Sequence, residues 1–261
     1  MNYQTLTVQT ESRVATLTLD RPDVRNAFNE TTIAEITQAF RELGQNADIR
    51  AIVLAANGPA FCAGADLNWM KKMAGYTHEE NRADAAQLAE MLRTIYACPK
   101  PVVAKVQGDC YAGGMGLVAA CDMAVAVDAS NFCLSEVKLG LIPATISPYV
   151  IRSMGEHAAR RYFLTAERFS AQEALRIGFV HAVVAADALD ATVGDIVKAL
   201  VSNSPNAVKQ AKRLVQDVAG KALTDALIAD TAERIADIRS SDEGKEGVRS
   251  FLEKRKPGWL S

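Results

Sequence analysis

The sequence is poor in the residues that build metal centres and covalent-catalysis sites. Its 261 residues include only three histidines and five cysteines. The histidines lie far apart and no two cysteines form a Cys-x-x-Cys pair, so we expect no metal. A Gly-x-Ser-x-Gly motif is also missing, which removes the usual starting point for a Ser-His-Asp hydrolase. Buried, reduced thiols account for the cysteines, and we therefore predict a cytoplasmic protein.

A basic surplus and a long apolar run are missing too. Lys and Arg total 29 against 31 Asp and Glu, a net charge of -2, so we expect no nucleic acid partner. No uncharged stretch reaches the roughly 20 residues of a spanning helix, and the first ten residues do not resemble a signal peptide. We therefore expect no membrane partner. Hydrophobic residues at 49% and charged residues at 23% are typical of a globular protein.

Strand-like and helical patterns alternate through the first three quarters of the chain. Five apolar runs bounded by Gly, Pro, Asn or Asp predict strands: Val14–Leu19, Ala51–Ala55, Val102–Val106, Met123–Val127 and Val180–Val184. Between them, apolar residues recur at helical spacing, at Ile33, Ile36, Phe40 and Leu43 and again at Leu88, Met91, Leu92 and Ile95. The order predicts an α/β fold with a mostly parallel sheet and helices outside it.

After about residue 195 the strand patterns cease. Ser204-Pro205 predicts a helix start, and further apolar patterns predict two more helices, the last of them around Phe251. We therefore divide the chain into a core, residues 1–195, and a C-terminal helical region, residues 196–261. Such a region either covers its own core or forms a subunit interface, and the pattern does not separate the two.

Two segments place small residues just after predicted strands. Residues 61–67 (FCAGADL) allow close approach of a ligand to the backbone, with Asp66 placed to cap the next helix. Residues 108–117 (GDCYAGGMGL) lead into an apolar helix, whose first N–H groups are unpaired and lie at the positive end of its dipole. Such N–H groups suit an anion or an oxyanion. Close packing at a tight turn or against the sheet explains each segment equally well.

The third unusual segment carries a carboxylate inside an apolar run. Glu136 lies within residues 132–143 (FCLSEVKLGLIP). A partly buried Glu has a raised pKa and can transfer a proton near neutrality. The alternatives are a surface edge shared with Lys138 or an ion pair with a distant Arg.

A competing motif is the pattern Gly114-x-Gly116-x-x-Ala119, which fits a loose dinucleotide-binding fingerprint. Glu136 falls 20 residues after Gly116, where a ribose-binding acid would lie. However, several residues separate the glycines from the preceding strand, and the motif lies in mid-chain. We therefore do not expect NAD binding.

Taken together, the three segments resemble the enoyl-CoA hydratase/isomerase (crotonase) superfamily. The resemblance runs from Arg21-Pro22 and Arg25-Asn26-Ala27-Phe28 to the tail at 253–257 (EKRKP). It implies a crotonase-like spiral of ββα repeats with C-terminal helices that form a homo-oligomer, a trimer or a dimer of trimers. It also implies an oxyanion hole from the N–H groups of Ala65 and Gly113, with Glu136 as the catalytic carboxylate.

The resemblance further implies where the acyl-CoA thioester substrate lies. Coenzyme A is then part of the substrate, and no separate cofactor is expected. The residues expected to contact the substrate or its CoA are Arg25, Ala27, Ala63, Asp66, Leu67, Tyr111, Gly114, Gly116 and Pro143.

One departure from the family pattern concerns the reaction. Typical hydratases carry glutamates at the positions of both Gly116 and Glu136, and this chain keeps only the second. The segments 134–144 (LSEVKLGLIPA) and 146–150 (ISPYV) resemble bacterial 3-methylglutaconyl-CoA hydratases of leucine degradation, which also tolerate Gly at the first position. That resemblance implies a hydro-lyase adding water to an enoyl-CoA. The alternatives are a Δ3,Δ2-enoyl-CoA isomerase with one glutamate and a non-catalytic acyl-CoA-binding scaffold.

A glutaconyl group has a distal carboxylate that requires a cation. Lys71, Lys72 and Arg82 follow the first oxyanion segment and are the candidates. Their other explanation is that they are solvated charges on a surface helix.

Overall fold

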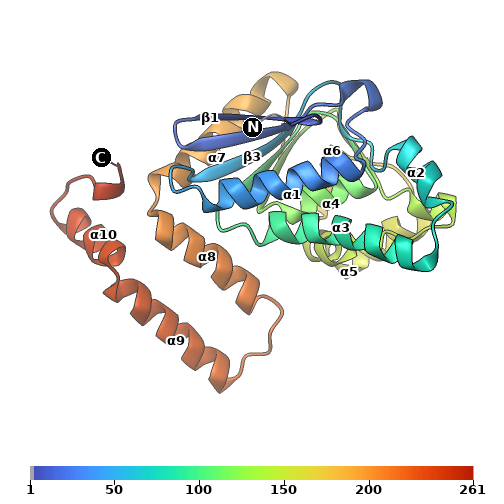
Figure 1. Ribbon diagram of the computed structural model, residues 1–261. Coiled ribbons are helices and arrows are strands. Elements are labelled where there is room, and N and C mark those ends of the chain that lie inside the picture. The colour runs from blue at the N-terminus through green and yellow to red at the C-terminus, as the bar shows by residue number, and fades with distance from the viewer. Residues whose placement is uncertain (1–2, 261) are drawn as a thin grey trace.

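The computed structural model describes residues 3–260, and its larger sheet contains all five predicted strands. Six strands lie in the order β1-β2-β3-β5-β7-β10 (Figure 1). Their bounds are β1 Leu6–Glu11, β2 Val14–Leu19, β3 Ala51–Ala56, β5 Val102–Val106, β7 Met123–Val127 and β10 Ala182–Val184. β1 and β2 pair antiparallel, and the other neighbours pair parallel. The prediction of a mostly parallel sheet is confirmed.

A second sheet consists of four short strands in the order β4-β6-β8-β9. They are β4 Ala60–Cys62, β6 Asp109–Tyr111, β8 Asn131–Cys133 and β9 Phe169–Ser170. β4, β6 and β8 pair parallel, and β9 joins antiparallel. Each long strand β3, β5 and β7 is followed by one short strand and then by a helix. This repetition is the ββα spiral that the resemblance implied.

Helices cover both faces of the larger sheet, which is why its inner strands β3, β5 and β7 are mostly apolar and buried. The helices of the core are α1 Glu30–Gln45, α2 Leu67–Met73, α3 His78–Tyr96, α4 Gly113–Ala120, α5 Ser147–Thr165, α6 Ala171–Arg176 and α7 Leu189–Ser202. Ile52 packs in the core cluster on the face of α1 and α3, while Val53 packs with Leu189 and Val193 of α7 on the other face. Short 3-10 helices lie at Pro22–Val24, Glu136–Leu139, Ala186–Ala188 and Gly258–Leu260.

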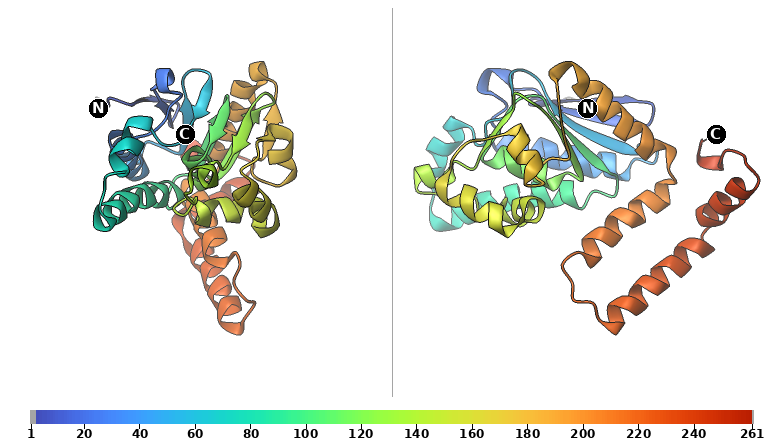
Figure 2. Two further views of the ribbon diagram at one scale, coloured as in Figure 1. Left: turned by 90° about the vertical axis from the view of Figure 1, so that its right-hand side faces the viewer. Right: turned by 180° about the vertical axis from the view of Figure 1, so that it is seen from behind.

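Three helices extend away from the core as an arm. They are α8 Pro205–Val218, α9 Asp225–Ser240 and α10 Asp242–Leu252 (Figures 1 and 2). Ser204 caps α8 as predicted, and the Lys212 ammonium ties α8 to Asp122 of the core at 2.7 Å. The division expected at residue 195 stays a prediction; it falls within α7, and we call α8–α10 the C-terminal arm.

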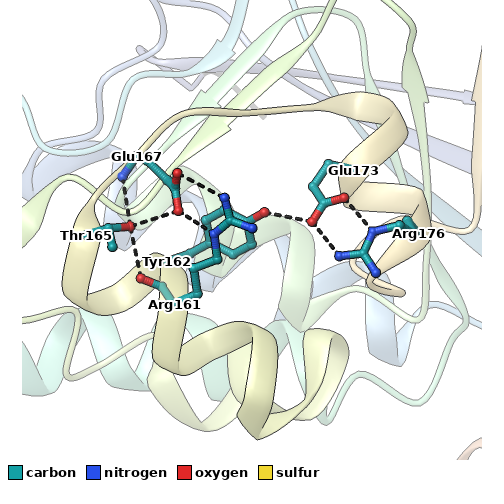
Figure 3. Close-up of polar contacts among 6 residues, drawn as sticks. All are labelled: Arg161, Tyr162, Thr165, Glu167, Glu173 and Arg176. Atoms are coloured by element: carbon teal, nitrogen blue, oxygen red, sulfur yellow. Dashed lines mark hydrogen bonds and ion pairs between the residues drawn. The ribbon is translucent and has the colours of Figure 1, made fainter.

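A polar cluster joins the end of α5 to α6 (Figure 3). The Tyr162 hydroxyl and the Arg176 guanidinium donate to one carboxylate, Glu173, at 2.7 Å and 2.6 Å. Arg161 similarly pairs with Glu167. The hydrogen bond from Arg176 lowers the pKa of the Glu173 carboxyl to about 2. These carboxylates are fixed in their charged form by neighbouring cations, so they serve structure.

The cysteines are all unpaired thiols, and four of the five are buried. Burial raises the pKa of the Cys62 thiol to about 12, so this thiol stays protonated and unreactive. Among residues 3–260, no helix is both long enough and apolar enough to cross a membrane.

Candidate active site

The first feature of the site is a peptide N–H without a partner at Ala65. Phe28 forms a parallel bridge with Ala65: its N–H donates to the Gly64 carbonyl, and its carbonyl accepts from the Asp66 N–H, both at 2.9 Å. These two hydrogen bonds involve Gly64 and Asp66, the residues on either side of Ala65. The N–H of Ala65 itself has no partner within the described part of the chain. Ala65 is half-buried. Its N–H is therefore available to a ligand oxygen.

The second unpaired N–H belongs to Gly113, the first residue of α4. The first N–H groups of a helix have no intrahelical partner. The preceding residue, Ala112, has φ 48° and ψ -123°, a conformation that alanine rarely adopts. Such a backbone costs on the order of 1–3 kcal/mol and persists where the surrounding structure requires it. A Cβ atom on Gly113 would lie 2.3 Å from Cζ of Phe28, so only glycine fits here.

The small sheet brings these two N–H groups together. β4 pairs with β6 through Cys62 and Cys110, and Ala65 and Gly113 each follow their strand by three residues or fewer. Gly64 has φ 93°, and a Cβ built on it would lie 3.0 Å from that of Ala112. The two segments are therefore in contact, and an oxyanion hole formed by these two N–H groups stays a prediction.

The third component, Glu136, follows β8, the next strand of the same sheet. The carboxyl ends of parallel strands meet at one edge, so β4, β6 and β8 deliver Ala65, Gly113 and Glu136 to the same edge. Oε2 of Glu136 is buried and has no hydrogen-bond partner in the part of the chain that the structure describes. Burial raises the pKa of the Glu136 carboxyl above its ordinary value. In contrast with Glu173, which Arg176 holds charged, Glu136 forms no ion pair within residues 3–260.

The raised pKa of Glu136 has a consequence for stability. The unfolded chain loses this proton at the ordinary pKa of 4.5, while the folded chain holds it to a higher pH. Between those two values the folded state binds more protons, so the free energy of unfolding falls as the pH rises through this window. Glutamine does not titrate, so Glu136→Gln should remove this decrease in the free energy of unfolding. Relative to the unchanged protein, the Tm of the variant should therefore rise more near neutrality than near pH 4.

The matched control is Glu173→Gln, which should act with the opposite sign. The pKa of Glu173 is lowered, so its contribution to stability is present above the ordinary pKa and is lost as the pH falls. This variant should therefore lower Tm near neutrality. A pH-independent change in Tm for Glu136→Gln would contradict a buried, proton-holding carboxyl.

An isoleucine fills the space beside Gly116, where two-carboxylate hydratases carry the other glutamate. A Cβ on Gly116 would lie 2.3 Å from Cγ2 of Ile146 and 3.5 Å from Cδ2 of Leu92. A Cβ on Gly114 would likewise lie 2.6 Å from the Cys62 carbonyl oxygen. Both glycines are therefore buried packing positions inside α4, and their contact with the substrate stays a prediction. A dinucleotide-binding loop connects a strand directly to a helix. Here β6 lies between β5 and α4, so Gly114 and Gly116 do not lie in such a loop.

Three of the residues expected to contact CoA line one cavity of about 200 Å³. They are Arg25, Ala63 and Tyr111, which share the cavity with Pro59, Ala60 and Asp109. Arg25 has φ 53°, is exposed, and forms no ion pair within residues 3–260. Its guanidinium is available to an anionic group such as a phosphate.

The remaining expected contacts differ in what they offer a ligand. Both carboxylate oxygens of Asp66 are engaged, one as the cap of α2 and the other in an ion pair with Arg21 at 2.8 Å. The predicted capping role of Asp66 is confirmed. Leu67 is 74% exposed, whereas Ala27 and Pro143 are buried.

The structure adds two residues that the sequence patterns did not single out, Trp69 and Asp84. The indole N–H of Trp69 donates to Asp84 at 3.0 Å, and its ring lies 5.9 Å from the ring of Phe28. Phe28 in turn fills the space beside Gly113. Trp69 is buried, three residues after the cap of α2. The signal available in the sequence was a tryptophan three residues after Asp66, the expected helix cap.

The cations considered for a distal carboxylate all lie on the surface. Lys71, Lys72 and Arg82 are exposed, and Lys72 pairs with Glu30 at 2.9 Å. For Lys72 the structure therefore supports the explanation of a solvated surface charge.

The fold and the site together place two unpaired N–H groups at the same sheet edge as a partly buried carboxyl group. A family model described as enoyl-CoA hydratase/isomerase matches residues 9–261. The chain therefore belongs to the enoyl-CoA hydratase/isomerase (crotonase) family. A crystal structure of an enoyl-CoA hydratase from Shewanella pealeana is similar with a TM-score of 0.96 and 45% identity, over 98% of this chain and 96% of that one.

Two relatives show different acyl groups within the family. The short-chain-enoyl-CoA hydratase of Clostridium acetobutylicum is 31% identical over 258 residues, 98% of this chain and 97% of the relative. The mevalonyl-coenzyme A hydratase sidH of Aspergillus fumigatus is 34% identical over 254 residues, 93% of this chain and 90% of the relative.

Proposed function

We propose that this protein is an enoyl-CoA hydratase that adds water across the 2,3 double bond of an acyl-CoA. The observation that carries the proposal is the pair of unpaired N–H groups, Ala65 and Gly113, at the same sheet edge as the partly buried carboxyl of Glu136. A hydratase needs both parts, because negative charge develops on the thioester oxygen while protons move nearby.

In the proposed reaction Glu136 handles both protons. Its carboxylate takes a proton from water as the hydroxyl oxygen bonds to C3, and the electron pair of the double bond shifts to the thioester oxygen. The N–H groups of Ala65 and Gly113 stabilise this enolate, each by roughly 3–4 kcal/mol. Glu136 then returns the proton to C2, so that one water molecule is added to one face of the double bond.

We further propose a branched acyl group, in particular that of 3-methylglutaconyl-CoA in leucine degradation. Two observations support this choice. The segment around Glu136 resembles bacterial enzymes of that reaction. A relative named for mevalonyl-CoA acts on an acyl group that also carries a methyl branch at C3.

No separate cofactor takes part in this proposal, and the location is cytoplasmic.

The second candidate is a Δ3,Δ2-enoyl-CoA isomerase, favoured by the lone glutamate and by the isoleucine that fills the space of the other. A single carboxylate could move a proton between C4 and C2. A non-catalytic scaffold is disfavoured, because an idle, partly buried carboxyl whose Oε2 has no hydrogen-bond partner within residues 3–260 costs stability.

Incubation with crotonyl-CoA, 3-methylglutaconyl-CoA and a 3-enoyl-CoA separates these candidates. Hydration removes the absorbance of the conjugated thioester, whereas isomerisation of the 3-enoyl-CoA creates it. Loss of absorbance with 3-methylglutaconyl-CoA supports the proposal in full. A change in absorbance with the 3-enoyl-CoA alone would contradict the hydratase and support the isomerase. No change with any of the three substrates would support the non-catalytic scaffold.

We also propose that residues 196–261 assemble the protein as a trimer or a dimer of trimers. No residue of α8 or α9 is buried, and the apolar side chains of Val215, Val248, Phe251 and Leu252 are between 62% and 81% exposed. Large apolar side chains exposed in this way are typical of an interface. Light scattering should therefore give three or six times the mass of 28.1 kDa. A stable monomer at micromolar concentration would contradict the proposal.

A further inference from the structure

Arg21 contacts both chain segments that form the bridge between Phe28 and Ala65. One terminal nitrogen of its guanidinium, Nη1, donates to the Ala27 carbonyl, and the other, Nη2, lies 2.8 Å from the carboxylate of Asp66. Ala27 precedes Phe28 in the chain, and Asp66 follows Ala65. The guanidinium therefore spans the bridge as a clamp, with one nitrogen on each side. The side chains of Arg21 and Asp66 are 22% and 7% exposed, so much of this ion pair is shielded from water.

The bridge decides in which direction the N–H of Ala65 points. That N–H and the Gly64 carbonyl belong to one planar trans peptide and point in opposite directions. The Gly64 carbonyl accepts a hydrogen bond from the Phe28 N–H at 2.9 Å. Because this hydrogen bond fixes the carbonyl, it also fixes the N–H on the other side of the same peptide. Gly64 has φ 93° and no Cβ to restrict the peptide, so the restriction has to come from the bridge.

Arg21 is itself held in place by Asn26. The backbone N–H of Arg21 donates to Oδ1 of Asn26, and the N–H of Asn26 donates to the Arg21 carbonyl, both at 2.9 Å. The Asn26 side chain is buried, and its amide also donates to the carbonyls of Asn57 and Ala60, at 2.7 Å and 2.9 Å. The clamp is therefore tied to the start of β4, the strand that leads to Ala65.

We infer that Arg21 is a positioning residue that aims the N–H of Ala65 at the thioester oxygen. The inference rests on the proposed function, because it takes Ala65 and Gly113 as the oxyanion hole. Arg21 acts through the bridge, and a displacement of about 1 Å far from the chemistry can cost about 10²-fold in rate. Arg21→Ala should therefore lower kcat by about 10²-fold with a smaller change in KM. Arg21→Lys keeps the charge but lacks the planar fork, so its kcat should lie between the two.

The deciding measurement is the carbonyl stretching frequency of bound butyryl-CoA, isotopically labelled at the thioester carbon. This saturated ligand does not react, and hydrogen bonds to its carbonyl oxygen lower the frequency. In the unchanged protein we expect a frequency below that of free butyryl-CoA. In Arg21→Ala the frequency should move back toward the free value, because one donor is no longer aimed. A merely structural role of Arg21 would lower Tm and leave the frequency of the folded variant as it is.

The matched control is Arg50→Ala. Arg50 is also a buried arginine that donates to a backbone carbonyl, that of Asn203 at 2.8 Å. It directly precedes β3, at the end of that strand away from β4. Its loss should lower Tm and change neither the carbonyl frequency nor kcat.

The outcomes separate this inference from the proposed function. A carbonyl frequency in folded Arg21→Ala equal to that in the unchanged protein overturns the inference, while the oxyanion hole stands. If the alanine variant does not fold, the same comparison is made with Arg21→Lys. If butyryl-CoA bound to the unchanged protein shows no lowered frequency, the oxyanion hole fails and the proposed function fails with it.

Discussion

Glu136→Gln is expected to lower kcat by about 10⁴-fold, with a much smaller change in KM. General acid–base catalysis contributes about 10²- to 10⁴-fold, and a single group serving two proton transfers belongs at the upper end. Glutamine keeps the shape of the side chain but neither takes nor gives a proton. Because the loss concerns the transition state more than substrate binding, it should appear in kcat. The measurement is steady-state hydration of the preferred enoyl-CoA.

Glu173→Gln is the matched control for this prediction. It removes a carboxylate of the same type that is held charged by Arg176 in the polar cluster of α5 and α6. Its rate should stay close to that of the unchanged protein once folding is confirmed by circular dichroism. A normal rate for Glu136→Gln would falsify the mechanism, whichever acyl-CoA is the true substrate.

Removing the N–H of Gly113 is expected to lower kcat by about 10²- to 10³-fold while much of the CoA affinity survives. One oxyanion-hole donor is worth that much in acyl-transfer enzymes. Gly113→Pro removes the donor, but its Cβ would also lie 2.3 Å from Phe28. Replacement of Gly113 by glycolic acid, which turns the amide into an ester, removes the N–H and adds no atom at Cα. This backbone variant therefore isolates the hydrogen bond.

The same amide-to-ester exchange at Gly194 in α7 serves as its control. A side chain at Gly194 would meet nothing within 4 Å, and this residue lies outside the site. Its ester weakens one helix hydrogen bond and should leave the rate unchanged. A folded Gly113 ester with a near-normal rate would show that the oxyanion is held elsewhere.

The inner strands β3, β5 and β7 could be predicted because burial on both faces favours apolar runs. The edge strand β1 was not predicted, because its residues are mostly polar and exposed. Residues 102–106 and 123–127 are strands with the bounds that the sequence predicts. The short strands β4, β6 and β8 could not be predicted from periodicity, since three residues carry no period. Their pairing depends on the spiral, which places segments 22–49 residues apart side by side. The resemblance to a family supplied what the local pattern lacked.

For this protein, the sequence by itself determined which chemical groups are present: a lone carboxylate in an apolar run, and glycines at a predicted helix start. Together with the family resemblance, these groups indicated an oxyanion hole and a proton-transferring residue. Only the tertiary structure decided that the N–H groups of Ala65 and Gly113 lack partners, because hydrogen-bond pairing depends on which strands adjoin. It alone also showed that Ile146 fills the space beside Gly116, since packing brings together residues that are 30 positions apart.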